Sequence, residues 1–386
     1  NQAGIIKEGV STLTLSGDNS SYQGKTTIKG GNIAISDAKN LGGKVAVELA
    51  GGSLKLLESL TVGANQDDSI NIIKDTRGTI DTVARTESVL AIAFKGAGVF
   101  VKEGEGKLTL SGDNTNFKGG VSVDKGILAV TSDNSLGESN TTLTLNGGTL
   151  QLDGVTELAR DVQLNQNSTI QNVSSSASVA LNRLKGDHEI SLNGGAFNLS
   201  ADTQSQDVNQ HKINQHNGTV LNNTTATISG DADLGKTTGQ LTFAGGAILD
   251  VQGQLDSSRS VMINNDDNVL NANANKVTLG VLSGTGAISK TGTGDLVLNQ
   301  NSQNYAGTAT ISQEAVVIGD NQALGTGQLV LENATTLKTS TALDNVATKI
   351  AVSEKATIDT AGFNSTLSGV VSGNGATEKI KTGRLA

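Results

Sequence analysis

Residues 7–19 read KEGVSTLTLSGDN, and close copies of this stretch recur at residues 102–114 (KEGEGKLTLSGDN) and 290–301 (KTGTGDLVLNQN). Inside each copy, apolar residues alternate with polar ones, as in Leu13-Thr14-Leu15. Such alternation places the apolar side chains on one face of an extended strand. The copies therefore predict short β-strands, and their recurrence predicts a repeat architecture.

The sequence after each opening repeats as well. An aromatic residue, a glycine two positions later and a closing Leu-Gly pair follow each opening: Tyr22, Gly24 and Leu41-Gly42; Phe117, Gly119 and Leu136-Gly137; Tyr305, Gly307 and Leu324-Gly325. A further pair, Leu234-Gly235, has no recognisable opening before it. Consecutive Leu-Gly pairs along the chain are separated by 95, 98 and 90 residues. We therefore predict one continuous fragment with repeats at 1–97, 98–191, 192–285 and 286–374, and the start of a fifth at 375–386.

Composition favours a solenoid over a compact globule. The chain has 386 residues, of which 48 are Gly, none is Pro, and only 2% are aromatic. Few rings are available for a globular core, whereas stacks of aliphatic side chains fill a narrow solenoid. Proline is excluded from interior strands because it lacks the N–H that pairs with the next strand. The prediction is an all-β fold, a parallel β-helix with coils of about 20–24 residues.

Charge and cysteine content exclude several functional classes. The formal net charge is −9 and the lysines are scattered, so a nucleic-acid partner is not expected. The absence of cysteine excludes disulfides, thiolate catalysis and cysteine-ligated metals. No apolar run approaches the roughly 18 residues of a membrane-spanning helix. We expect any signal peptide to lie outside the given sequence, so export has to be argued from other features.

At the repeat openings the sequence resembles the passenger-associated transport repeats of Gram-negative autotransporters, which use type Va secretion. The pattern of a Leu-x-Leu-x-Gly-x-Asn start, an aromatic-x-Gly and a final Leu-Gly matches residues 13–42 and 108–137. Residues 296–325 also match this pattern. There, Asn299 and Asn301 replace the Ser-Gly-Asp type of sequence found in the other two openings. The resemblance implies a right-handed parallel β-helix displayed on the cell surface of a Gram-negative bacterium. It also implies a longer precursor with a signal peptide and a C-terminal membrane barrel, both expected to lie outside this chain.

Paired carboxylates are the first candidates for catalysis, because some β-helical enzymes use clustered acids on polysaccharides. Such pairs occur at Asp67-Asp68 and Asp266-Asp267. Adjacent residues of a strand point to opposite faces, which separates the two carboxylates unless they lie in a turn. Solvated turn acids are therefore the preferred interpretation, and we expect no enzymatic activity.

Histidines and acidic turns are the candidates for metal binding. His211 and His216 are five residues apart, a spacing that does not share one helix face and would need a loop. Residues 264–268 (NNDDN) offer oxygen ligands but lack the spacing and the final Glu of an EF-hand, so calcium stays an open alternative. No cofactor and no metal are predicted.

What remains is the surface, and three polar stretches stand out at 65–87, 201–223 and 264–276. Solvated insertions are the simplest interpretation of any one of them. As candidate contact residues we select Asn65, Asp67, Asp68, Asp75, Gln206, Asn209, Gln210, His211, Asn214, His216, Asn264, Asp266, Asp267, Asn268, Asn271 and Asn273.

The resemblance extends to the self-associating adhesins of the family, which clump bacteria and build biofilm. We therefore expect a surface-displayed adhesin whose partners are copies of itself on neighbouring cells. Amide and hydroxyl groups can bind a copy of the same surface, and many copies per cell supply avidity. The alternatives are adhesion to a host glycan or matrix protein, and an inert stalk for an effector head outside this chain.

Overall fold

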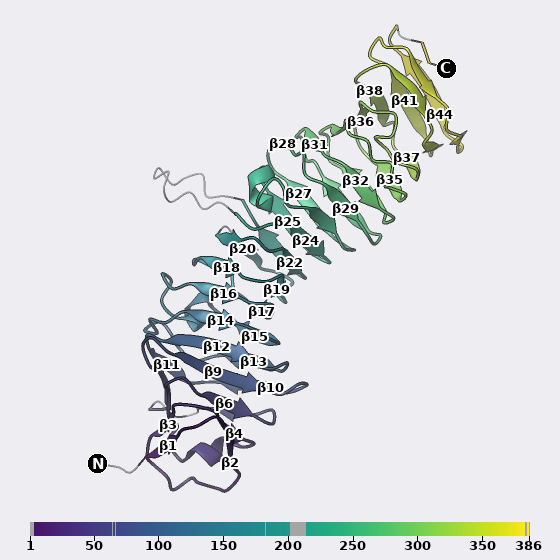
Figure 1. Ribbon diagram of the computed structural model, residues 1–386. Coiled ribbons are helices and arrows are strands. Elements are labelled where there is room, and N and C mark those ends of the chain that lie inside the picture. The colour runs from purple at the N-terminus through teal and green to yellow at the C-terminus, as the bar shows by residue number, and fades with distance from the viewer. Residues whose placement is uncertain are drawn as a thin grey trace. The chain divides into compact units, whose positions relative to one another are not determined.

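A computed structural model describes residues 4–63, 65, 67–181, 183–200, 214–382 and 384–385. The described residues form β-strands and three short 3-10 helices, η1 (Ala38–Leu41), η2 (Asp133–Leu136) and η3 (Asp231–Leu234). Neighbouring strands pair in parallel throughout the two compact units described below (Figure 1). The fold is a parallel β-solenoid, which confirms the predicted all-β class and β-helix.

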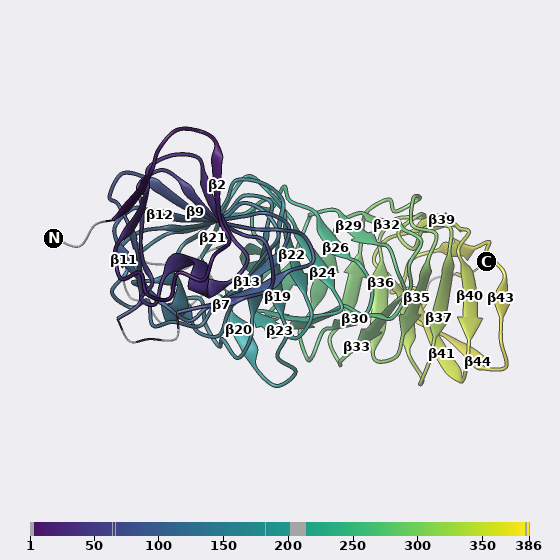
Figure 2. The same ribbon diagram turned by 90° about the horizontal axis from the view of Figure 1, so that it is seen from below.

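The chain forms two compact units. Unit 1 holds residues 1–179 and 183–188, and unit 2 holds residues 180–182 and 189–386. The strand β20 (Ser178–Ala180) lies where the two units divide. Figure 2 looks nearly along the stack of unit 1, where successive coils superimpose into one outline.

Unit 1 contains three sheets, and each coil contributes strands to them in turn. The first sheet is β1 (Ile5–Lys7), β3 (Thr26–Ile28), β5 (Ala46–Leu49), β8 (Ser69–Ile72) and β11 (Ala93–Gly96). The second is β2 (Thr12–Leu15), β4 (Asn32–Ile35), β6 (Ser53–Leu56), β9 (Arg77–Thr82), β12 (Val99–Glu103), β14 (Val121–Val123), β16 (Leu143–Leu145), β18 (Val162–Leu164) and β21 (Leu184–Gly186). The third contains β7 (Thr61–Val62), β10 (Glu87–Leu90), β13 (Lys107–Leu110), β15 (Ile127–Val130), β17 (Thr149–Leu152) and β19 (Ser168–Asn172).

Unit 2 is built in the same way. One sheet contains β22 (Ile190–Asn193), β24 (Thr219–Asn222), β26 (Leu241–Phe243), β29 (Val261–Ile263) and β32 (Leu282–Gly284). A second contains β23 (Ala196–Asn198), β25 (Thr225–Ile228), β27 (Ile248–Val251), β30 (Asn268–Asn271), β33 (Ile288–Thr291), β35 (Thr308–Ile311), β37 (Gln328–Leu331), β40 (Lys349–Val352) and β43 (Val371–Ser372). A third contains β28 (Leu255–Asp256), β31 (Val277–Leu279), β34 (Leu296–Leu298), β36 (Ala315–Ile318), β38 (Thr336–Thr339), β41 (Lys355–Asp359) and β44 (Ala376–Ile380), and a small one pairs β39 (Leu343–Val346) with β42 (Ser365–Leu367).

The core is a set of aliphatic columns that run from coil to coil. In unit 1, Leu108, Leu128, Leu150 and Ile170 are register partners on β13, β15, β17 and β19, and all four are fully buried. Each column results from the period-two alternation of apolar residues, repeated at the spacing of one coil. Full burial of one such side chain contributes about 1.5–3 kcal/mol.

Backbone geometry explains the glycine of the Leu-Gly pair, which closes the first half of each repeat. Gly137 has φ of 96°, in the left-handed region, and a Cβ there would lie 2.7 Å from the carbonyl oxygen of Phe117 on the preceding coil. Gly325 has φ of 68°, and its Cβ would lie 2.1 Å from the carbonyl oxygen of Tyr305. Only glycine fits both the conformation and the close approach of the coils.

Candidate functional site

Two of the predicted contact residues, Asp68 and Asn268, are buried and connect neighbouring coils. The Asp68 carboxylate accepts hydrogen bonds from the backbone amides of Val45 (2.8 Å) and Asn65 (3.1 Å). Asn268 donates from Nδ2 to the carbonyl of Ala287 at 3.0 Å. These side chains satisfy backbone groups between coils, so they have no surface to offer a partner. The prediction of surface contact is corrected for both.

Asn214 is a third buried residue among the predicted contacts, and it occupies a repeat position. Its Nδ2 donates to the carbonyl of Asp233 at 2.9 Å. In the second repeat, Asn114 donates in the same way to the carbonyl of Ser135 at 2.8 Å. Both acceptors directly precede the leucine of a Leu-Gly pair. Asn214 is therefore the counterpart of the asparagine that ends the opening motif, and its side chain is structural.

His216 is the fourth buried residue, and it replaces the repeat's aromatic ring. Its carbonyl accepts from the amide of Lys236 at 2.9 Å, as the carbonyl of Phe117 accepts from Glu138 at 2.9 Å. Gly218 follows two positions later, as in the aromatic-x-Gly pattern. The third repeat thus keeps part of its opening. This partial opening is hard to recognise in the sequence, because a histidine replaces the aromatic residue and lies one position closer to the Leu-Gly pair.

Among the other predicted contact residues, six lie exposed in turns: Asn65, Asp67, Asp75, Asn264, Asp266 and Asp267. Gln206, Asn209, Gln210 and His211 lie outside the described residues. The Asp67 side chain is 82% exposed whereas Asp68 is buried, so this acid pair points in opposite directions. Asn271 and Asn273 are half-buried, and they lie in the surface feature described next.

Two open depressions meet on the surface of unit 2. The first, of about 650 Å³, lies over β27, β30 and β33 and is lined by Asn271, Asn273 and Thr293. The second, of about 410 Å³, is lined by residues after β35 and β37, including Asn333 and the exposed Glu314. Thr293 and Gln313 line both. We call the joined feature the amide trough and define it by Asn271, Asn273, Thr293, Gln313 and Asn333.

Hydrogen bonds fix the amides of the trough in place. One carboxylate oxygen of Asp250 accepts from Nδ2 of Asn271 at 2.7 Å and from Nδ2 of Asn273 at 2.9 Å. Asp250 and Asn271 are register neighbours on β27 and β30. On the next coil, Gln313 Oε1 accepts from the amide of Gly292 at 2.7 Å. The trough therefore presents ordered amide and hydroxyl groups, which lose little entropy on binding.

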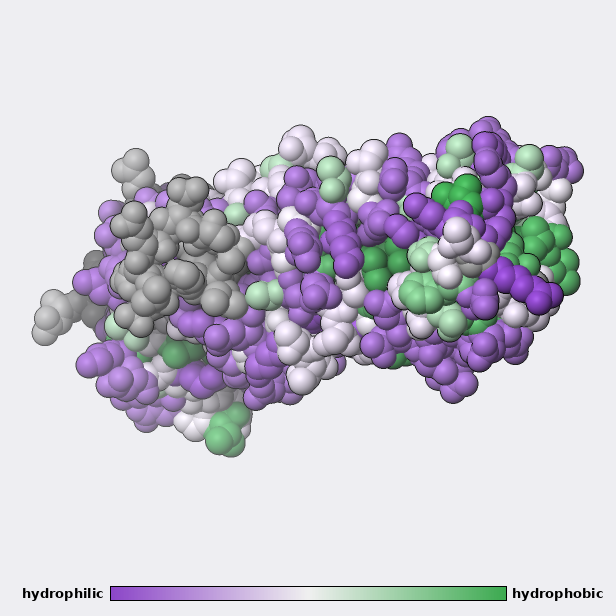
Figure 3. Space-filling view, turned by 90° about the horizontal axis from the view of Figure 1, so that it is seen from above, coloured by the Kyte–Doolittle hydropathy of each residue, from purple (hydrophilic) through white to green (hydrophobic). Residues whose placement is uncertain are grey.

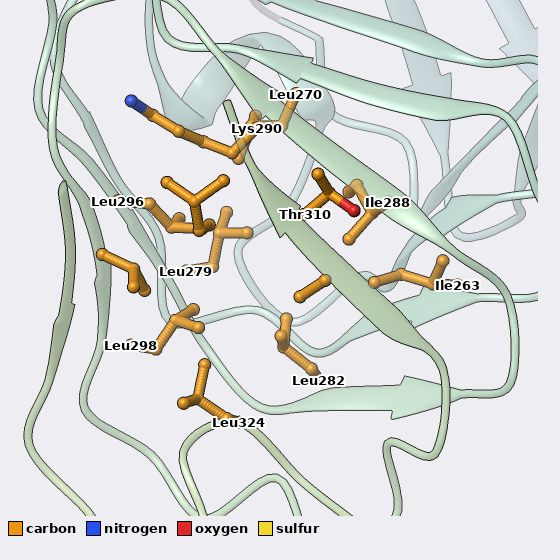
Figure 4. Close-up of a pocket in the computed structure, with 13 residues that line it drawn as sticks. Ile263, Leu270, Leu279, Leu282, Ile288, Lys290, Leu296, Leu298, Thr310 and Leu324 are labelled. Carbon is orange, nitrogen blue, oxygen red and sulfur yellow. The ribbon is translucent and has the colours of Figure 1, made fainter. Parts of the chain in front are cut away.

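The surface and the interior of unit 2 differ sharply in polarity. Figure 3 shows a mostly hydrophilic exterior with small hydrophobic patches. Figure 4 shows an internal cavity lined by aliphatic side chains such as Leu282 and Leu298, with the nitrogen of Lys290 pointing away from them. The cavity measures only about 20 Å³, room for one water at most. A ligand larger than water therefore does not fit this cavity.

The lysine that begins each opening motif is buried and serves backbone carbonyls. Lys102 Nζ donates to the carbonyls of Glu103 (2.8 Å), Gly104 (2.7 Å) and, one coil further, Lys125 (3.1 Å). Lys7 makes the corresponding three bonds, and Lys290 donates to the carbonyls of residues 292 and 313. Burial lowers the pKa of Lys102 to about 8. In the sequence this lysine is visible only as part of the motif, because its role depends partly on a carbonyl one coil away.

Arg160 is a second buried cation that sequence analysis missed. Its side chain is fully buried and reaches back one coil to η2. Nε donates to the Asp133 carboxylate at 2.7 Å, while the two terminal nitrogens donate to the carbonyls of Leu136 (3.0 Å) and Gly137 (3.0 Å). The guanidinium thus satisfies the carbonyls at the end of the 3-10 helix.

Arg259 repeats this arrangement in unit 2. It donates to the Asp231 carboxylate at 2.8 Å and to the carbonyl of Leu234 at 3.2 Å. The signal in the sequence is an arginine 24 or 25 residues after the leucine of the Leu-Gly pair. That distance is about one coil, so the signal is visible only once the coil length is known.

Nothing in the described residues resembles a metal centre or a membrane helix. No group of three or more His, Cys, Asp or Glu side chains is placed to hold a metal ion within the parts of the chain described. Among the same residues, no helix has the length and apolar character to span a bilayer.

Comparisons with known proteins support the repeats. The passenger-associated-transport-repeat family model matches residues 5–35, 100–130 and 288–313. The chain is 37% identical over 128 residues to a protein named adhesin BmaC autotransporter from Brucella suis biovar 1 (strain 1330). That match covers 33% of this chain and 4% of the relative, so the chain spans only a small part of it. No solved structure matches.

The fold and these matches support an autotransporter passenger that contains passenger-associated transport repeats. The three matched ranges contain the openings with the buried lysines Lys7, Lys102 and Lys290. The third repeat is unmatched, in agreement with its degenerate opening around Asn214 and His216.

Proposed function

We propose that this passenger is a non-enzymatic adhesin displayed on the bacterial surface, and that it binds copies of itself through the amide trough. The observation that carries the proposal is the row of ordered amides and hydroxyls on the outside of unit 2, where the exposed Glu314 is the one charged residue of the lining. The relative's name contains the word adhesin, which supports the adhesive class in general. Cell-surface display follows from the autotransporter class.

Self-association suits the chemistry of the trough. Amides both donate and accept hydrogen bonds, so two copies of one surface can face each other across a two-fold axis. Each hydrogen bond contributes only about 0.5–1.5 kcal/mol net. A single contact is therefore weak, and display of many copies makes the adhesion strong.

A double substitution tests this proposal in cells that display the passenger. Thr293→Glu with Gln313→Glu places two carboxylates on the exposed part of the trough, and the glutamate at 313 keeps an acceptor for the amide of Gly292. We expect settling of the displaying cells to slow at least tenfold, because two like-charged surfaces repel on approach. The optical density of standing cultures measures the effect.

The control carries the same two substitutions on unit 1, at the exposed residues Thr115 and Gln166. It should settle like the wild type. Equal slowing by both pairs would mean that net charge rather than the trough governs adhesion. Unchanged settling of the trough variant would refute the trough as the interface, and retained binding to a glycan or matrix array would then favour adhesion to a host surface.

A further inference from the structure

His216 lies in unit 2, and only one of its two ring nitrogens has a hydrogen-bond partner there. The residue is fully buried, and its Nε2 lies 2.7 Å from the hydroxyl oxygen of Thr219. That hydroxyl donates to the carbonyl of Leu234 at 3.2 Å, so it can accept from Nε2. Nδ1 has no hydrogen-bond partner among the described residues. The imidazolium form would place a second N–H on Nδ1 with no acceptor, which is costly in a buried site.

The charges around the ring add to this cost. Arg259, from the following coil, and Lys236, after η3, are the two cations that oppose protonation of His216. Burial is the largest cause and, together with these cations, lowers the pKa of His216 to about 3. The folded unit therefore holds the ring neutral at neutral and mildly acidic pH.

The nearby acids are committed to other groups. On η3, the Asp231 carboxylate holds Arg259, and the Asp233 carboxylate accepts from the amides of Ser229 and Gly230. Glu189 lies beside Gly218, and burial raises the pKa of its carboxyl. These elements therefore place no carboxylate against the His216 ring that would stabilise its charged form.

We propose that His216 is an acid-sensitive point of unit 2, at which protonation in acid opens the coils that contain β24, η3 and β26. The closed coils exclude the proton, whereas an opened coil exposes the ring to water and binds it with the ordinary histidine pKa of about 6.5. Acid therefore favours the open form. Phe117 and Tyr305 fill the same position in other repeats, where no titratable nitrogen is present. The third repeat thus differs from its neighbours in its response to pH, independently of the adhesive trough.

Hydrogen exchange of the whole chain between pH 7 and pH 4, corrected for the intrinsic pH dependence of exchange, tests the proposal. In the wild type, the opening constant for the amides of β24 and β26 should rise about tenfold per pH unit below roughly 6.5. His216→Phe should remove that rise, because a ring of the type found at Phe117 cannot take up a proton. The half-buried His188 provides the control, and His188→Gln should behave like the wild type.

An equal rise in His216→Phe, or no rise in the wild type, would overturn the proposal. His216→Tyr, which introduces the ring type found at Tyr305, serves if the phenylalanine variant does not fold. A direct titration gives a second readout on the unmodified protein. The NMR signals of the His216 ring should remain those of a neutral imidazole in the folded protein down to pH 5, and a folded-state titration near pH 6.5 would contradict the proposal.

Discussion

Replacement of Arg160 by leucine is expected to lower the free energy of unfolding of unit 1 by about 3–5 kcal/mol, the usual cost of breaking a buried ion pair. The change leaves the Asp133 carboxylate without its cation and the carbonyls of Leu136 and Gly137 without donors. Arg259→Leu should have the same effect in unit 2, because its contacts are equivalent. Urea unfolding followed by circular dichroism measures the loss.

A surface arginine of unit 1 provides the matched control. Arg77 pairs with Asp124 at 2.9 Å, but its side chain is 57% exposed. Arg77→Leu should therefore cost less than about 1 kcal/mol, as exposed ion pairs do. Arg160→Lys should recover only part of the loss, because an ammonium cannot reproduce the planar fork. A similar cost for Arg160→Leu and Arg77→Leu would contradict the role assigned to the buried guanidinium.

The second large effect is expected from Lys102→Met, which should lower the free energy of unfolding by about 2–3 kcal/mol through carbonyls left without a donor. Methionine fills the volume of the lysine stem but donates no hydrogen bond to the carbonyls of Glu103, Gly104 and Lys125. Because the Lys125 carbonyl belongs to the next coil, loss of protection should appear on both coils in hydrogen exchange.

Lys107→Met is the control for this substitution. Lys107 lies on β13, a few residues after Lys102, and is half-buried rather than enclosed. Its replacement should change the free energy of unfolding by less than about 0.5 kcal/mol. If Lys102→Met is equally harmless, the opening lysine is not a connector between coils, and its recurrence in three repeats needs another explanation.

The fold was predictable from the sequence because its causes are local and repeated. Alternation such as Leu143-Thr144-Leu145 specifies a strand with one buried face, and the structure has β16 there with that burial pattern. The Leu-Gly pairs mark a glycine in the left-handed region at the same place in each repeat. Local chemistry of this kind needs no knowledge of which coils become neighbours.

The buried polar residues were harder to recognise because their partners lie about one coil away. Asp68 and Asn268 stand in stretches that look like solvated turns, yet their side chains satisfy backbone groups of the adjacent coil. Lys102 precedes a glutamate and a glycine, a context typical of exposed turns. In a solenoid, turns stack on turns, so a polar side chain in a turn finds acceptors above and below it.

The candidate trough was found only in part. Asn271 and Asn273 were selected because their stretch is polar, and the structure places them in the trough. Thr293, Gln313 and Asn333 were not selected, since each belongs to a different coil. Their grouping depends on the register of β30, β33, β35 and β37, which the sequence pattern alone does not define.

Sedimentation velocity of the purified chain tests most directly whether the outside of this solenoid binds a second copy. The trough predicts that the sedimentation coefficient of the wild type rises with concentration in a reversible manner. The variant with Thr293→Glu and Gln313→Glu should sediment as a monomer over the same range. A wild-type coefficient that does not change with concentration up to the millimolar range, or an equal rise in wild type and variant, would contradict self-association through the trough.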